Sequence, residues 1–149
     1  SHKTLSDLGN NMNNISARYG KEVCIAEVSY GWTTGYNDDK GNEFWTDDEE
    51  IAATVLLDSD GEVYDGIEVA TREDGTKYIP ATVQNQANVI RAVVEKVAQV
   101  SNNKGLGFFV WEPCWIATSS VPSTWENQAM FDFNGNALPS LKVFGVKGK

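Results

Sequence analysis

The sequence contains one histidine and two cysteines among its 149 residues. These are too few nitrogen and sulfur ligands for a zinc framework, and two cysteines do not make a disulfide scaffold. No apolar run approaches the roughly 20 residues that a membrane helix requires, and residues 1–4 do not resemble a signal peptide. We therefore expect no membrane span and no zinc-stabilised fold.

Basic residues are also scarce. Twelve lysines and arginines against 21 acidic residues give a net charge of −9, which disfavours binding to the phosphate backbone of a nucleic acid. Hydrophobic residues make up 41 % of the chain and charged residues 22 %, which is typical of a globular domain. Aromatic residues are abundant, with five Trp, five Tyr and six Phe, and sugar rings stack on such flat faces.

Two helices are predicted from the spacing of apolar residues. Residues 5–19 carry an apolar stripe at intervals of three and four, and Gly20 is a typical C-terminal stop. Residues 82–100 carry a second stripe, with Thr82 as the N-cap. A last short helix, near residues 139–144, is expected to pack on the sheet. The first stripe comprises Leu5, Leu8, Met12, Ile15 and Tyr19.

Residues 23–26 and 106–111 are short apolar runs that resemble buried strands. Because a predicted helix separates them, the order indicates an α/β fold with two parallel strands. We expect Phe108 and Phe109 in the core, Cys24 packed as a small hydrophobe, and Cys24 and Cys114 as free thiols. Two strands cannot close a barrel, and a complete (β/α)8 barrel needs about 250 residues.

The segment at about 33–80 is predicted to be a loop and hairpin excursion. It is long and polar at its start, and long structured loops in compact domains are usually functional. Asp-Gly pairs at 60–61 and 74–75 lie next to strand-like runs, which indicates antiparallel hairpins.

Two glutamates follow the predicted strands. Glu27 comes directly after the first apolar run, and Glu112 lies between Trp111 and Pro113. Parallel barrels keep their catalytic groups at these strand ends, and a retaining glycosidase needs two carboxyl groups about 5–5.5 Å apart. Together with Trp32, Trp111 and Trp115, the pair suggests a glycosidase cleft. The alternative is that each glutamate merely ends a strand on the solvent side.

Four blocks of sequence make this hypothesis specific. They lie at residues 26–32, 80–87, 107–116 and 125–141, and the most distinctive motifs are Trp-Glu-Pro-Cys-Trp at 111–115 and Asn-Gln-Ala-Met-Phe-Asp-Phe at 127–133. In content and order the blocks resemble glycoside hydrolase family 53, the endo-β-1,4-galactanases that cut the galactan of type I arabinogalactan.

The resemblance implies that residues 1–149 are the C-terminal part of a (β/α)8 TIM barrel, an α/β fold. The segment would run from about the sixth helix to the eighth helix, with a β-hairpin insertion in the loop after the seventh strand. Glu27 matches the family's nucleophile, at the end of the seventh strand. Trp111 matches the tryptophan that floors the sugar subsite beside the cleavage point. Glu112 and Trp115 match neighbouring cleft positions, and Trp32 is a further substrate-binding candidate.

The family's acid/base glutamate follows an asparagine at the end of the fourth strand, before the nucleophile. Only 26 residues precede Glu27 here, so we expect that strand to be absent and the isolated chain to be inactive. Gly41-Asn42-Glu43 imitates the family's acid/base block, but no strand pattern precedes it, which favours a coincidental polar loop. If Glu43 folded back toward Glu27, the chain could act alone.

The same loop carries oxygen ligands suited to calcium: Asp38, Asp39, Asn42 and Glu43. Some bacterial members of the resembled family bind calcium in the corresponding loop. Lys40 stands where their histidine would fall, however, and a lysine opposes a cation. A solvated acidic loop is the alternative, and the chemistry itself requires no cofactor.

The resemblance also implies a secreted or cell-surface parent enzyme, with its signal peptide outside this chain and arabinogalactan as its partner. The exposed edges of a barrel segment predict self-association. A rival hypothesis is a non-catalytic carbohydrate-binding or scaffold fragment that uses aromatic stacking alone. A generic protein-interaction domain is a third.

Overall fold

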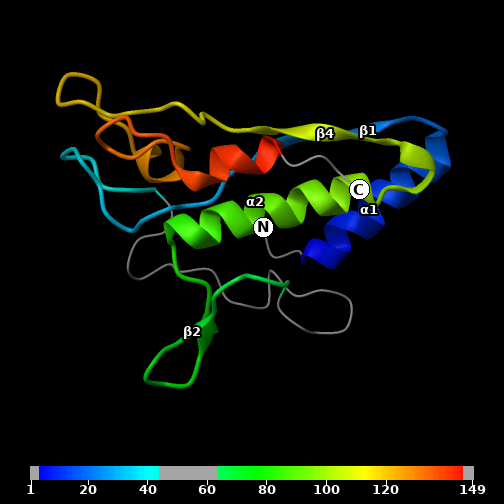
Figure 1. Ribbon diagram of the computed structural model, residues 1–149, viewed down its shortest axis with the longest axis horizontal. Coiled ribbons are helices and arrows are strands. Elements are labelled where there is room, and N and C mark those ends of the chain that lie inside the picture. Colours follow the sequence, from blue (N-terminus) through cyan, green and yellow to red (C-terminus); the bar gives the residue numbers. More distant parts are fainter. Residues whose placement is uncertain (1–3, 44–63, 146–149) are drawn as a thin grey trace.

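A computed structural model describes residues 4–43 and 64–145 of the chain. Its centre is a parallel pair of strands, β1 (Val23–Val28) and β4 (Gly105–Val110), packed on the helix α2 (Val83–Ala98) that connects them. Figure 1 shows the two strands running side by side along one flank of α2. The predicted order of strand, helix and parallel strand is therefore confirmed.

The helix α1 (Leu5–Tyr19) has the predicted bounds. Thr4 and Asp7 form a capping box, in which each side chain accepts the other residue's backbone N–H at 3.0–3.1 Å. Gly20 ends the helix in the left-handed conformation, at φ 65°. Among the described residues, no helix is long and apolar enough to cross a membrane.

The predicted stripe of α1 is only partly correct. Leu5 and Met12 are buried as expected, whereas Ile15 and Tyr19 are exposed. A helical period shows which side chains share a face, but it does not show how far the neighbouring layer extends along that face. The part of α1 near β1 lies beyond the end of α2, as Figure 1 shows, which leaves that end of the stripe uncovered.

One face of the sheet is covered and the other is open. Ile25 and Phe108 pack against the core cluster beside α2. Phe109, expected in the core, is 68 % exposed, and Cys24 is exposed too. Both expectations were wrong because they assumed strands buried on both faces, and in the described part of the chain β1 and β4 pair only with each other.

The core lies between α2, the covered face of the sheet and α1. Gly105 begins β4 where the strand approaches α2 most closely, since a Cβ added there would lie 1.9 Å from the carbonyl oxygen of Val97. Only glycine fits at that contact. The buried core residues are Leu5, Met12, Tyr30, Ile67, Ile79, Val89, Ala92, Val93, Val97 and Val100.

Smaller elements complete the fold. The strands β2 (Ala70–Thr71) and β3 (Lys77–Tyr78) form an antiparallel pair around the Asp-Gly turn at 74–75, which projects from the body in Figure 1. The other expected hairpin, at 58–61, lies outside the described residues. Between α2 and residue 145, the structure has three 3-10 helices: η2 (Ser101–Asn103), η3 (Glu126–Gln128) and η4 (Pro139–Gly145).

The short helix predicted near residues 139–144 is the 3-10 helix η4. It packs mainly on α2 rather than, as expected, on the sheet. A ring contact with the sheet joins Phe144 to Phe108, with 5.6 Å between ring centroids. The proline at its start and the hydrogen bond between Ser140 and Gln86 of α2, at 2.7 Å, explain this placement.

Candidate active site

The carboxyl ends of β1 and β4 meet at one edge of the sheet. Val28 is paired with Val110, and the backbone N–H of Trp111 donates to the carbonyl oxygen of Val28 at 2.9 Å. Glu27 is therefore near the end of β1, and Glu112 lies one residue beyond Trp111. The side chain of Glu27 is exposed and that of Glu112 is partly buried, so the structure brings both predicted carboxylates to the same edge.

Glu112 has a left-handed backbone, with φ at 44°. Non-glycine residues rarely adopt this conformation, and those that do are concentrated at functional sites. The chain then turns tightly, and the N–H of Trp115 donates to the Glu112 carbonyl at 3.3 Å. This turn keeps the motif Trp-Glu-Pro-Cys-Trp at the strand end instead of letting it continue the sheet.

The three candidate tryptophans differ in exposure. Trp111 is 44 % exposed and Trp115 is 36 % exposed, so each ring offers surface to a ligand. Trp32 is partly buried, and its ring packs against Phe133 with 4.8 Å between centroids. Trp111 and Trp115 therefore have the accessibility that sugar stacking needs, and Trp32 is held against the protein.

Two loops frame this edge, and Gln86 of α2 ties them together. We call residues 29–43 the β1 loop and residues 111–130 the β4 loop. The Gln86 amide nitrogen donates to the carbonyls of Tyr30 at 2.9 Å and Ala129 at 2.8 Å. Its oxygen accepts from Ser140. Gln86 is fully buried. No role was predicted for it, because Gln84, Asn85 and Asn88 are polar neighbours in the same stretch and nothing in the pattern distinguishes Gln86 from them.

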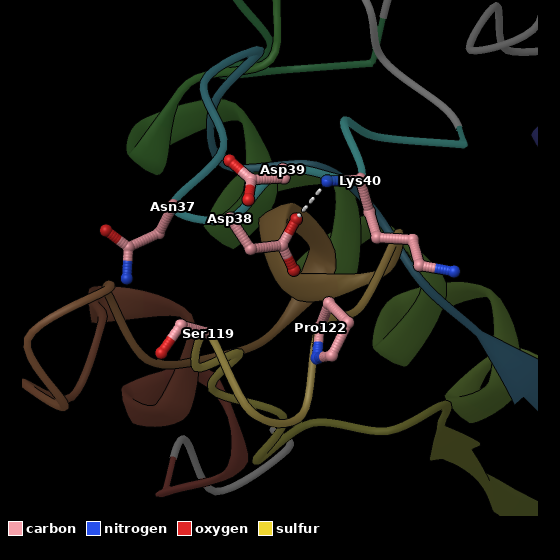
Figure 2. Close-up of a pocket in the computed structure, with 6 residues that line it drawn as sticks. All are labelled: Asn37, Asp38, Asp39, Lys40, Ser119 and Pro122. Carbon is pink, nitrogen blue, oxygen red and sulfur yellow. Dashed lines mark hydrogen bonds between the residues drawn. The ribbon is translucent and has the colours of Figure 1, made fainter.

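The predicted calcium ligands lie in the β1 loop beside a cavity of about 260 Å³. Both carboxylate oxygens of Asp38 already accept backbone N–H groups, from Lys40 at 2.7 Å and from Ser123 at 2.6 Å. The side-chain nitrogen of Asn42 donates to the carbonyls of Thr34 and Gly35. Figure 2 shows the Lys40 side chain pointing away from both aspartates.

Within the described ranges, no three His, Cys, Asp or Glu side chains converge in a way that could hold a metal ion. In the structure both Asp38 oxygens are engaged by N–H groups, which would compete with a cation for them. Calcium binding through Asp38, Asp39 and Asn42 and direct hydrogen bonding of Asp38 are therefore alternatives, and calorimetric titration with calcium chloride distinguishes them.

Glu43, which lies in the Gly41-Asn42-Glu43 run that resembles the family's acid/base block, is hydrogen-bonded to the β4 loop. Its backbone N–H donates to the Thr124 carbonyl at 2.9 Å, and its carboxylate accepts from the Thr124 hydroxyl at 3.4 Å. No strand precedes Glu43 among residues 29–43. This placement supports the interpretation of Glu43 as part of a polar loop.

Glu126 is an unexpected buried carboxyl group, with 1 % of its surface exposed. Its Oε1 accepts the backbone N–H of Asn37 at 2.5 Å. Burial raises the pKa of the Glu126 carboxyl above its ordinary value, while the Asn37 N–H acts in the opposite direction. Sequence spacing gave no sign of this contact, because 89 positions separate the two residues.

Comparison with known proteins gives a consistent result. The family model of glycosyl hydrolase family 53 matches residues 1–63 and 48–144. The chain is 31 % identical to an endo-beta-1,4-galactanase of Bacillus subtilis, over 96 % of this chain and 35 % of that protein. It is 28 % identical to an arabinogalactan endo-beta-1,4-galactanase of Humicola insolens, over 95 % of this chain and 32 % of that protein.

Solved structures agree. The GH53 catalytic domain of Ignisphaera aggregans superimposes with a TM-score of 0.68 at 33 % identity, over 95 % of this chain and 34 % of that domain. A fungal beta-1,4-galactanase superimposes with a TM-score of 0.57 at 28 % identity. The chain thus spans about a third of the relatives that it matches. Since the family model covers almost the entire sequence and the structural match covers 95 % of the chain, the chain belongs to glycosyl hydrolase family 53.

Proposed function

We propose that the chain is the C-terminal part of a retaining endo-β-1,4-galactanase barrel, from about the sixth helix to the eighth, with a hairpin insertion in the loop after β1. Its substrate would be the β-1,4-galactosidic bonds of type I arabinogalactan. One observation carries the proposal. Glu27, at the end of β1, lies at the same sheet edge as the Trp111-Glu112 pair that follows β4.

In this proposal Glu27 is the nucleophile. Its carboxylate attacks the anomeric carbon as the glycosidic C–O bond breaks, which forms a glycosyl-enzyme ester. An acid/base glutamate from a part of the barrel outside these 149 residues protonates the leaving oxygen and later deprotonates the attacking water. Trp111 and Trp115 stack on sugar rings, with Trp32 and Glu112 as further contacts. No cofactor takes part.

The isolated chain should hydrolyse galactan poorly. Without a general acid, the reaction loses a contribution of about 10²–10⁴ in rate, and the open face of the sheet leaves the cleft incomplete.

We also propose that isolated copies associate through the edges of β1 and β4, which have no other partner strand in the described part of the chain. Light scattering would detect this as a mass above 16.4 kDa.

The parent enzyme would be secreted or act at the cell surface. A carbohydrate-binding fragment remains the second candidate function, and the exposure of Trp111 and Trp115 is the observation that favours it. The two candidate functions differ in whether they require the carboxylate of Glu27. A binding fragment needs the tryptophans but not the carboxylate.

Release of reducing sugar from β-1,4-galactan tests the proposal. The wild-type chain, Glu27→Gln and Glu43→Gln are compared, with galactan binding measured on the same samples. Galactan binding with negligible release from all three is expected. Release that Glu27→Gln abolishes would show a general acid within the chain or its oligomer, and loss in Glu43→Gln would identify that acid. Release that survives Glu27→Gln would contradict the assigned nucleophile.

A further inference from the structure

The β1 loop and the β4 loop are joined by a series of hydrogen bonds at the open edge of the sheet. The N–H of Trp32 donates to the Asn127 carbonyl at 2.9 Å, and the Asn127 side-chain nitrogen donates to the Thr33 carbonyl at 3.1 Å. Farther out, the N–H of Glu43 donates to the Thr124 carbonyl. The β1 loop is thus cross-linked, between Trp32 and Glu43, to residues 123–127 of the β4 loop.

Two of these cross-links use carboxylates, and they are reciprocal. Asp38 of the β1 loop accepts the Ser123 N–H at 2.6 Å, and Glu126 of the β4 loop accepts the Asn37 N–H at 2.5 Å. Burial and the nearby Asp38 carboxylate raise the pKa of the Glu126 carboxyl, and a carboxyl oxygen accepts the Asn37 N–H whether or not the group is ionised. The first bond is part-buried, as is the second, so competition with water is reduced.

These carboxylates lie next to the backbone groups that hold Trp32. Glu126 immediately precedes Asn127, whose carbonyl and side chain bind the backbone of residues 32 and 33. Loss of the Glu126 contact would release the part of the β1 loop around Asn37. The hydrogen bonds from Asn127 would then have to hold Trp32 without that support. A carboxylate that fixes a loop in this way acts on ligand contacts without touching the ligand.

We propose that Asp38 and Glu126 are positioning residues, which clamp the β1 loop directly to the β4 loop without a bridging cation and so hold Trp32 in place at the cleft. The ligand role of Trp32 rests on the proposed function, whereas the clamp itself does not. The hydrogen bonds agree with this, because Asp38 accepts one N–H group from each loop, from Lys40 and from Ser123.

Backbone hydrogen exchange of the wild-type chain, observed residue by residue by NMR, tests the clamp. The variants are Glu126→Ala, Glu126→Gln and Asp38→Ala, with Asp39→Ala as the matched control, since Asp39 is an exposed neighbour. Glu126→Gln keeps a carbonyl acceptor for the Asn37 N–H and should rescue the effect of Glu126→Ala. Each sample is measured with added calcium chloride and with EDTA, and the Trp32 indole resonance is recorded in parallel.

We expect the exchange of the Asn37 and Ser123 amides to accelerate at least about tenfold in Glu126→Ala and Asp38→Ala. The Trp32 indole resonance should shift in both, while amides within α2 exchange as in the wild type. Glu126→Gln and Asp39→Ala should resemble the wild type, and neither calcium nor EDTA should change the result. If Glu126→Ala does not fold, Asp38→Ala decides the question.

Two outcomes would overturn the clamp. One is wild-type exchange at Asn37 and Ser123 in Asp38→Ala. The other is acceleration by EDTA, or by Asp39→Ala, as large as that caused by Asp38→Ala, since this would show that a cation holds the loops. Neither measurement uses galactan, so failure of the clamp is distinguishable from failure of the proposed function.

Discussion

The backbone N–H of Trp111 donates to the carbonyl oxygen of Val28 at 2.9 Å, one residue beyond the last paired positions of β1 and β4. This bond extends the parallel pairing past Glu27, which lies within β1, to the residue before Glu112. A nucleophile and a sugar-stacking tryptophan can act on the same ligand only if the two strand ends are level. The proposed chemistry depends on that alignment.

Replacing Gln86 with leucine should destabilise the chain. The substitution leaves the carbonyls of Tyr30 and Ala129 and the Ser140 hydroxyl without their buried partner, and each such loss costs about 1–3 kcal/mol. We expect the free energy of unfolding to fall by about 3 kcal/mol or more in urea denaturation followed by circular dichroism. Gln84→Ala, on the exposed side of the same helix, should change it by less than about 0.5 kcal/mol. Equal effects would contradict the role of Gln86.

Gly105→Ala should also be destabilising. The new Cβ would meet the Val97 carbonyl oxygen at 1.9 Å, and because that atom belongs to the backbone of α2, the strand or the helix must shift. The expected cost is about 2 kcal/mol. Gly145→Ala is the control, since a Cβ at Gly145 meets nothing within 4 Å. Unchanged thermal stability of Gly105→Ala would show that β4 does not approach α2 so closely.

Trp111→Ala should weaken binding to β-1,4-galactan without unfolding the chain. The ring is 44 % exposed, so its removal leaves no large cavity, whereas a stacked sugar loses its platform. Affinity electrophoresis in galactan-containing gels measures the effect. Phe109→Ala removes a more exposed aromatic ring two residues earlier and should bind galactan as the wild type does. Equal retardation of both variants and the wild type would place the sugar elsewhere.

The contribution of Asp132 to the stability of the fold should be lost at low pH. Its carboxylate accepts the side-chain N–H of Asn136 at 2.9 Å and the backbone N–H groups of Asn134 and Asn136. The Asn136 side chain holds the pKa of the Asp132 carboxyl below its ordinary value of 3.8. A lowered folded-state pKa stabilises the fold above 3.8, and this stabilisation is lost as the pH falls through the folded-state value.

The free energy of unfolding of Asp132→Asn should therefore fall less than that of the wild type as the pH is lowered below about 4. Asn136→Ala removes the main cause of the lowered pKa and should flatten the acid dependence in the same direction. Thermal unfolding measured across this pH range provides the comparison. Parallel curves for the wild type and both variants would mean that the Asp132 contacts do not persist in solution.

Much of the fold could be predicted because it depends on local patterns. The capping residues Thr4 and Gly20 and the stripe between them define α1, and an apolar run on each side of α2 defines β1 and β4. The exposure of Ile15 and Phe109 could not be predicted in this way. Periodicity identifies a face, but whether another layer covers that face depends on which strands and helices are present.

Some residues of the candidate site could be predicted from the sequence and others could not. Glu27, Trp111 and Glu112 could be found because each follows directly on an apolar strand pattern. Gln86 and Glu126 were missed because their partners lie far away in the sequence, 43 and 89 positions from them in the Ala129 and Asn37 contacts. No local spacing encodes a bond between a helix and two loops, and the loop cross-links became visible only in three dimensions.

The central claim is that Glu27 is the nucleophile of a galactanase barrel, and a chimera tests it most directly. This chain would replace the matching third of the Bacillus subtilis endo-beta-1,4-galactanase, which would supply the remaining strands. The folded chimera should release sugar from galactan, and Glu27→Ala should reduce release at least about a thousandfold. With an aryl β-galactoside and sodium azide, that variant should form the α-galactosyl azide, because azide enters from the face that the carboxylate vacates. A Glu27→Ala chimera that still cleaves galactan, or that yields only the β-azide, would contradict the assignment.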